Sequence, residues 1–155
     1  MSQSELRAVF LSELEDLLLQ MEQDILELER QEDTESTLQR LFRSAHTLKG
    51  SSAVMGFDVM VSLTHAMENV LDELRQQRLD PTPDLINALF QALDKLTIMK
   101  QELESSGHIA STGEEEIIRL EACGHLSARF QKTLIVTIAF DPACVMKAAR
   151  AHIIL

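Results

Sequence analysis

A short segment of the sequence places a histidine, a lysine and a glycine at helical spacing: His46, Lys49 and Gly50. Residues three and four positions apart share one face of a helix, so Lys49 and Gly50 would flank the His46 imidazole. Glycine is disfavoured in a helix interior by about 1 kcal/mol relative to alanine, which indicates that something must approach the histidine closely. A lysine would place an ammonium beside an anion attached to the ring. These residue types together fit an imidazole that accepts a phosphoryl group, with His46 as nucleophile, Lys49 supplying charge and Gly50 giving access.

A second segment, which follows Gly56, offers partners for this histidine. If the chain reverses at Gly56, residues equidistant from it face each other; His46 lies 10 residues before it, and His65 and Glu68 lie 9 and 12 after it. We therefore expect Glu68 to reach the imidazole and His65 to lie one turn away on the same face. A carboxylate at one ring nitrogen would set the tautomer and leave the lone pair of the other nitrogen free for attack.

Apolar periodicity predicts four long helices to position these residues. The four stripes are Leu6, Phe10, Leu14, Leu17, Met21, Ile25 and Leu28; Leu38, Leu41, Ala45, Leu48 and Ser52; Met60, Leu63, Met67, Val70 and Leu74; and Ile86, Leu89, Leu93, Leu96 and Leu103. Ser2 with Glu5 predicts a capping box at the first helix, and Thr82 before Pro83 predicts the start of the fourth. Long helices with short connections indicate an antiparallel four-helix bundle.

The sequence changes character after the fourth helix. The bundle is expected to occupy residues 1–105, and residues 106–131 are expected to form a linker with a short helix. Residues 133–140 are rich in β-branched types and predict a strand that leads into a further helix, so residues 132–155 are expected to be the truncated start of a second, α/β domain. The predicted fold class is therefore all-α, an antiparallel four-helix bundle with an additional short helix, plus a C-terminal strand–helix fragment.

Composition excludes several classes of protein. The 155 residues are 45% hydrophobic and carry a formal net charge of −11, which argues against nucleic acid or an anionic membrane as the main partner. No apolar run approaches the roughly 20 residues of a membrane span, and the N-terminus lacks the features of a signal peptide. Two cysteines form no disulfide framework. We expect a cytoplasmic protein without direct membrane contact.

Three further patterns concern an acidic surface, metal binding and ATP binding. Residues 1–37 hold eleven acids and two bases, which predicts a solvated acidic face, with a docking surface as the alternative. Cys123 and His125 form one pair where a structural zinc site needs about four ligands, so no metal site is predicted. Five scattered glycines form no glycine-rich ATP loop, so this chain alone is not expected to hydrolyse ATP or transfer its phosphate.

The residues around the histidine resemble a known family. The run from His46 to Gly50, the pair Gly56-Phe57 and the run from Thr64 to Glu73 are similar to the N-terminal histidine phosphotransfer (HPt) domain of chemotaxis histidine kinases of the CheA family. This resemblance covers about residues 1–125. It implies that His46 is phosphorylated at Nε2 by the ATP-binding domain of the kinase in trans. The phosphoryl group then passes to an aspartate of a CheY- or CheB-type response regulator.

The resemblance also implies roles for the neighbouring residues. Glu68 would hold Nδ1 of the imidazole, Lys49 would assist the phosphoryl group, and His65 would belong to the hydrogen-bonding site. ATP and Mg²⁺ would be bound by the partner kinase domain and Mg²⁺ by the regulator, with no cofactor on this chain. The segment from Lys132 is similar to the opening of a regulator-docking domain. Because the ATP-binding core is absent from the sequence, the chain would be the phosphoacceptor part of a histidine protein kinase, and whether it is an enzyme by itself stays open.

Two other classes of function are compatible with the sequence. A helical adaptor would bind through the acidic face of the first helix and would not need His46. A general HPt relay module of a hybrid kinase would receive its phosphoryl group from a regulator aspartate instead of from ATP. The chemotaxis-like segment around His65 and Glu68 favours the CheA-type function over the second of these.

Overall fold

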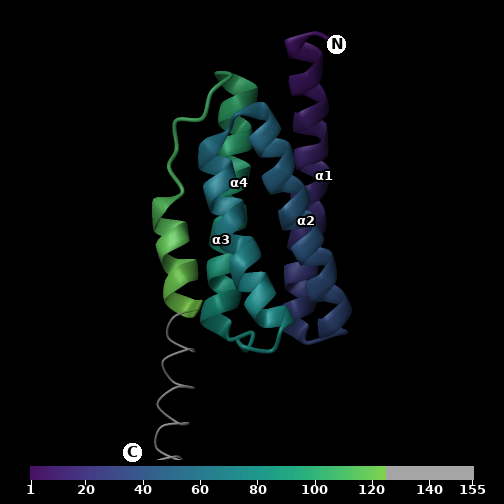
Figure 1. The fold of residues 1–155 in the computed structure, drawn as a ribbon, viewed down its shortest axis with the longest axis vertical. Helices are drawn as coiled ribbons and strands as arrows, with labels where there is room; N and C mark the ends of the chain where they lie inside the picture. The colour runs from purple at the N-terminus through teal and green to yellow at the C-terminus, as the bar shows by residue number, and fades with distance from the viewer. Residues whose placement is uncertain (125–155) are drawn as a thin grey trace, which may run out of the picture.

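The structure, a computed structural model, describes residues 1–124 and is entirely helical over that range. Four long helices are followed by a fifth that occupies residues 114–124 (Figure 1). The long helices are α1 (Gln3–Arg30), α2 (Thr34–Met55), α3 (Asp58–Arg75) and α4 (Pro83–Ser105). The all-α bundle with an additional short helix is confirmed. The predicted strand–helix fragment at 132–155 lies outside the described residues.

The helix boundaries follow from local hydrogen bonding. The Ser2 hydroxyl accepts a hydrogen bond from the Glu5 backbone N–H, and the Ser2 N–H donates to the Glu5 carboxylate at 2.7 Å, which is the predicted capping box. Thr82 caps α4 by accepting from the backbone N–H of Leu85. At the end of α2, Gly56 adopts φ 76°, a left-handed conformation that glycine enters without steric cost. This turn reverses the chain and places α3 against α2.

The four long helices pack as an up-and-down bundle. Successive helices run antiparallel in Figure 1, with α1 beside α2 and α4, and α3 beside the same two helices. The apolar stripes predicted for α2, α3 and α4 are all buried. Among described residues 1–124, no helix combines the length and the apolar character needed to cross a membrane.

The stripe predicted for α1 needs two corrections. Leu18 is 7% exposed and lies in the core, whereas Leu17 is only half-buried. Since α1 contacts both α2 and α4, its buried face is centred between the two helices and includes Leu18. Leu6 is 41% exposed, because it lies in the first turns of α1, which extend past the α2–α3 connection in Figure 1.

The fifth helix packs against the bundle. Its Leu120 is completely buried, and the backbone at Gly113 passes so close to Leu63 of α3 that an added Cβ would lie 3.4 Å from that side chain. The preceding connection is held by Glu102 of α4. The Glu102 carboxylate accepts hydrogen bonds from the Ser111 backbone N–H at 3.0 Å and from its hydroxyl at 2.6 Å. This segment is therefore an ordered part of the domain.

An ion pair between a buried carboxylate and a partly exposed arginine joins α1 to α2 near their connection, and nothing in the apolar pattern predicted it. The Asp24 side chain is completely buried, and Arg40 Nε lies 2.9 Å from its Oδ1. Gln20 donates to the same oxygen at 3.2 Å. A buried carboxylate needs such partners, because an uncompensated charge in the core is strongly destabilising. The pair therefore favours one register of α1 against α2.

Candidate functional site

His46 of α2 and Glu68 of α3 meet across the seam between these helices. His46 Nδ1 lies 3.0 Å from Glu68 Oε1, in agreement with the similar distances of the two residues from Gly56 along the chain, 10 and 12 residues. The His46 side chain is 63% exposed, whereas that of Glu68 is 13% exposed. The site is thus an accessible imidazole with one ring nitrogen held by a carboxylate that is largely removed from solvent.

The Glu68 carboxylate contacts two cationic or potentially cationic groups, one with each oxygen. Its Oε2 lies 2.7 Å from Lys49 Nζ, while its Oε1 faces the His46 imidazole. Lys49 is one turn along α2 from His46 and is largely covered. The carboxylate therefore links the imidazole and the ammonium into a single group of three side chains.

The ionisation state of Glu68 determines which imidazole tautomer is present. Burial raises the pKa of the Glu68 carboxyl, but the hydrogen bonds and charges of Lys49 and His46 together outweigh burial, so that the pKa lies below its usual range. An ionised carboxylate can only accept hydrogen bonds, so the hydrogen between it and the ring belongs to Nδ1. In the neutral ring the lone pair is then on Nε2, on an exposed side chain.

Gly50 and His65 lie one helical turn from His46 and Glu68, respectively, but take no part in these interactions. Gly50 is exposed, and an added Cβ would meet no atom within 4 Å, so packing inside the domain does not require a glycine here. The exposed His65 forms no hydrogen bond or ion pair with any residue in the range 1–124. Of the five residues singled out in the sequence, the structure brings together His46, Lys49 and Glu68.

The sequence pattern did not single out Phe42, which adjoins His46, or Arg75, which contacts Phe42. The Phe42 ring lies 6.2 Å from the imidazole, centroid to centroid, and the two planes differ by 12°. The Arg75 guanidinium lies 4.0 Å from the centroid of the Phe42 ring. The separation of four residues between Phe42 and His46 places them on one helix face and could have indicated this contact.

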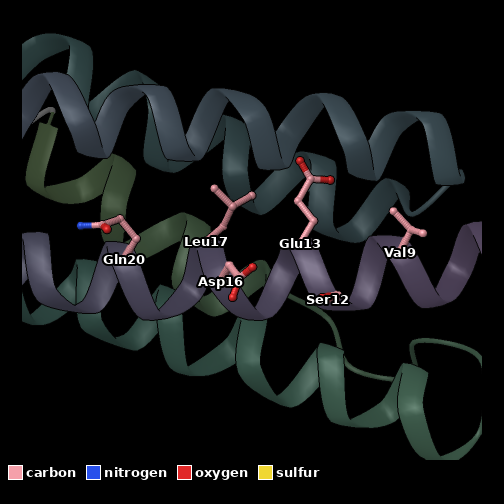
Figure 2. A pocket seen from close by; sticks show the side chains of 6 residues that line it. All are labelled: Val9, Ser12, Glu13, Asp16, Leu17 and Gln20. Carbon is pink, nitrogen blue, oxygen red and sulfur yellow. The ribbon is translucent and has the colours of Figure 1, made fainter.

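The acidic face of α1 carries a shallow groove. Six residues line it: Val9, Ser12, Glu13, Asp16, Leu17 and Gln20. Figure 2 shows that all six project from α1, with Glu13 and Leu17 directed toward the neighbouring α2. This surface mixes apolar and acidic groups and does not include the exposed imidazole and carboxylate of the His46 site.

Metal coordination is not indicated in the described part of the chain. Residues 1–124 contain no group of three or more histidine, cysteine, aspartate or glutamate side chains placed to hold a metal ion. His125, the partner in the weak pair with Cys123, lies outside the described residues.

Curated relatives are chemotaxis proteins. The chemotaxis protein CheA of Listeria innocua is 35% identical over 147 residues, which is 92% of this chain and 24% of that protein. The chemotaxis protein CheA of Bacillus subtilis is 39% identical over 99 residues, which is 64% of this chain and 15% of that protein. The chain therefore spans no more than about a quarter of the length of these relatives.

Solved structures with the same arrangement of helices are HPt domains. The phosphorylated P1 domain of CheA3 in complex with CheY6 from R. sphaeroides superimposes with a TM-score of 0.71 at 29% identity, covering 81% of this chain and 97% of that one. The histidine phosphotransfer domain of CheA in solution also gives 0.71, at 30% identity, covering 78% and 92%. The sequence profile of the Hpt domain matches residues 5–106, which is more than half of the chain. The chain is therefore a member of the Hpt domain family.

Proposed function

We propose that this chain is the phosphoacceptor module of a bacterial chemotaxis histidine kinase. His46 receives a phosphoryl group from ATP held by the kinase ATP-binding domain in trans, and passes it to an aspartate of a CheY- or CheB-type response regulator. The observation that carries this proposal is the exposed imidazole whose Nδ1 lies 3.0 Å from a largely buried carboxylate. The similarity to CheA chemotaxis proteins, and to a P1 domain bound to CheY6, supports the choice of partners.

The forward step forms a bond at Nε2 of His46. The Nε2 lone pair attacks the γ-phosphorus, the bond from that phosphorus to the bridging oxygen breaks, and ADP leaves. The proton stays on Nδ1, so the ring becomes positively charged as the new bond forms. Glu68 faces that proton and stabilises the charge that develops. Lys49 keeps Glu68 ionised and places positive charge one turn from the phosphoryl group.

The return step reverses the charge change without moving a ring proton. A carboxylate oxygen of the regulator aspartate attacks the phosphorus, the bond from phosphorus to Nε2 breaks, and its electron pair returns to Nε2. The neutral ring is regenerated with its proton still on Nδ1, held by Glu68. In this proposal Gly50 presents bare backbone to the approaching partner, and the exposed His65, one helical turn from Glu68, hydrogen-bonds to that partner.

The wider assignments belong to the same proposal. ATP and Mg²⁺ are bound by the partner kinase domain, and Mg²⁺ also by the regulator, with none held by this chain. The protein acts in the cytoplasm. Residues 1–105 form the phosphotransfer bundle, residues 106–131 form a linker whose short helix packs on that bundle, and residues 132–155 begin a regulator-docking domain.

Intact-mass analysis after incubation with ATP, Mg²⁺ and a kinase core supplied in trans tests the proposal. Four chains are compared: the wild type, His46→Gln, His65→Gln and His108→Gln. His65 is the neighbouring exposed histidine, and His108 lies in the connection after α4. The expected result is one acid-labile phosphoryl group on every chain except His46→Gln, with circular dichroism showing unchanged helicity in that variant.

Other outcomes would overturn parts of the proposal. Phosphorylation that persists in His46→Gln and disappears in His65→Gln would move the acceptor to α3. No phosphorylation of the wild type by the kinase core, combined with phosphorylation by a phosphorylated regulator, would make the chain a relay module of a hybrid kinase. Failure of both donors would leave a helical adaptor.

A further inference from the structure

One hydrogen bond does not set the orientation of the His46 ring. Glu68 holds Nδ1, but the ring is otherwise attached only through the rotatable Cα–Cβ and Cβ–Cγ bonds, and the His46 side chain is 63% exposed, so the ring can still tilt about the Glu68 contact. In-line attack requires the Nε2 lone pair to point at the phosphorus, so each misdirected orientation lowers the fraction of reactive sites. A second contact on the ring is needed to restrict the pivot.

Phe42 supplies a flat surface beside the imidazole. Its ring lies nearly parallel to that of His46, with planes 12° apart and centroids 6.2 Å apart, which is within the range of favourable offset aromatic pairs. Phe42 is half-buried and packs against the core, so its own position is anchored. A rotation of the imidazole out of this plane would lose the contact.

Arg75, in the last turn of α3, holds the Phe42 ring from the neighbouring helix. Its guanidinium lies 4.0 Å from the ring centroid, a cation–π distance. The same guanidinium donates to Asp72 at 2.8 Å and to Gln39 of α2 at 3.2 Å. These two hydrogen bonds anchor the cation against the phenyl ring.

From this arrangement we infer that Phe42 is a positioning residue for His46, and that Arg75 acts through Phe42. The inference rests on the proposed role of His46 as phosphoacceptor. Glu68 determines which nitrogen carries the lone pair, and the Phe42 plane restricts the direction in which that lone pair points. Neither Phe42 nor Arg75 is proposed to touch the phosphoryl group.

Phosphoramidate, a small phosphoryl donor, separates ring positioning from partner docking. Nε2 forms a bond to its phosphorus, the phosphorus–nitrogen bond of the donor breaks, and ammonia leaves. Rates are compared in the 155-residue chain for the wild type, Phe42→Leu, which removes the flat ring, and Phe42→Tyr, which keeps it. Phe90→Leu is the matched control, because Phe90 is also half-buried but lies on α4.

We expect Phe42→Leu to slow phosphorylation by roughly three- to tenfold, the change in productive population that loss of one aromatic contact produces. Phe42→Tyr should restore a rate near that of the wild type, and Phe90→Leu should leave it unchanged. The ring-current shifts of the His46 carbon-bound protons should be lost in Phe42→Leu and retained in the other two. Arg75→Gln should give a smaller decrease, whereas Arg78→Gln, which removes a cation paired with Glu73, should give none.

The outcomes separate this inference from the function on which it rests. If the wild type accepts no phosphoryl group from either phosphoramidate or the kinase core, the proposed function fails. If the wild type is phosphorylated and Phe42→Leu matches it in rate, Phe42 has no positioning role. If Phe42→Leu and Phe90→Leu are slowed equally, in proportion to lost stability in urea unfolding, Phe42 is only a packing residue and the inference is wrong.

Discussion

Replacing Glu68 by alanine tests whether its carboxylate fixes and activates the His46 imidazole. The change removes the hydrogen bond at Nδ1 of His46 and leaves Lys49 without its counter-ion. The neutral imidazole can then carry its proton on either nitrogen, and the form protonated at Nε2 has no lone pair there. The charge that develops on the ring during attack also loses its partner. We therefore expect slower phosphorylation of an intact fold.

The expected magnitude follows from the strength of the lost contact. A hydrogen bond to a charged group contributes about 1.5–3 kcal/mol, and each 1.36 kcal/mol corresponds to a factor of ten in rate, which gives roughly 10- to 150-fold. The His46 side chain is 63% exposed, so water replaces part of the interaction. We expect a decrease in the lower part of this range, about 10- to 30-fold.

The assay is the initial rate of phosphoryl transfer from Mg·ATP by a kinase core in trans, at saturating kinase. Glu73→Ala is the matched control, because Glu73 is also on α3 and is paired with a cation, Arg78, away from His46. Glu68→Gln keeps the size and shape of the side chain but removes its negative charge, so it tests the contribution of the charge separately. One end of an amide is an NH₂ group, which would face either the Lys49 ammonium or Nδ1 of His46, so this variant should also be slow.

Nitrogen NMR of the His46 ring provides the independent readout. The wild type should show the proton on Nδ1 of the neutral ring, and Glu68→Ala should show a mixture of the two tautomers. A Glu68→Ala rate within twofold of the wild type, together with an unchanged tautomer, would refute the role of Glu68 in fixing the imidazole.

Three further predictions concern access, stability and pH. Gly50→Leu should leave the unfolding free energy unchanged or raise it by about 1 kcal/mol, because a Cβ added at Gly50 meets open space. The same variant should accept phosphoryl groups from the kinase core more slowly and from phosphoramidate at the wild-type rate. A normal rate of transfer from the kinase core would show that Gly50 does not serve partner access. Arg40→Ala should lower the unfolding free energy by about 3 kcal/mol in urea titration, because it leaves the buried Asp24 carboxylate without its cation and with only the Gln20 amide as donor, and a loss below about 1 kcal/mol would contradict this account. Hydrogen bonds from Ser111 hold the pKa of Glu102 below its ordinary 4.5, so the stability that the ionised form adds is present above that pH and is lost as pH falls through the lower folded-state pKa. The melting temperatures of the wild type and Glu102→Gln should thus converge on acidification, and a widening gap would show the opposite sign.

Most of the buried residues of the bundle could be predicted from the sequence alone, because the spacing of apolar residues indicates one buried face on each helix. The prediction was wrong at two positions of α1, Leu6 and Leu17. On α1, Leu17 and Leu18 both fit helical spacing, and only the joint packing of α2 and α4 makes Leu18 the buried residue. The buried Asp24 was also missed, since an acidic residue in an acidic segment is normally expected to be solvated.

The candidate site was accessible to sequence reasoning to a similar degree. The position of Gly56 indicated that Glu68 can reach His46, because two antiparallel helices joined by a short turn pair approximately by their distance from it, but the spacing alone did not prove the pairing. The same argument placed His65 on the same helix face as Glu68. It did not predict that His65 would be exposed and would form no hydrogen bond or ion pair with residues 1–124. Phe42 is on the correct helix face, yet spacing does not give the angle between two rings.

The order of residues along the chain was sufficient to predict the helical class, the starts of α1 and α4, the candidate histidine and the carboxylate that faces it. These follow from local rules of capping, turn geometry and periodicity, which operate over a few residues. The packing of the helices was needed to establish that Glu68 is shielded while His46 stays exposed, that Lys49 shares the same carboxylate, and that Arg75 lies over Phe42. Solvent exposure, pKa and ring orientation depend on atoms contributed by separate helices, so these properties exist only once the helices have packed together.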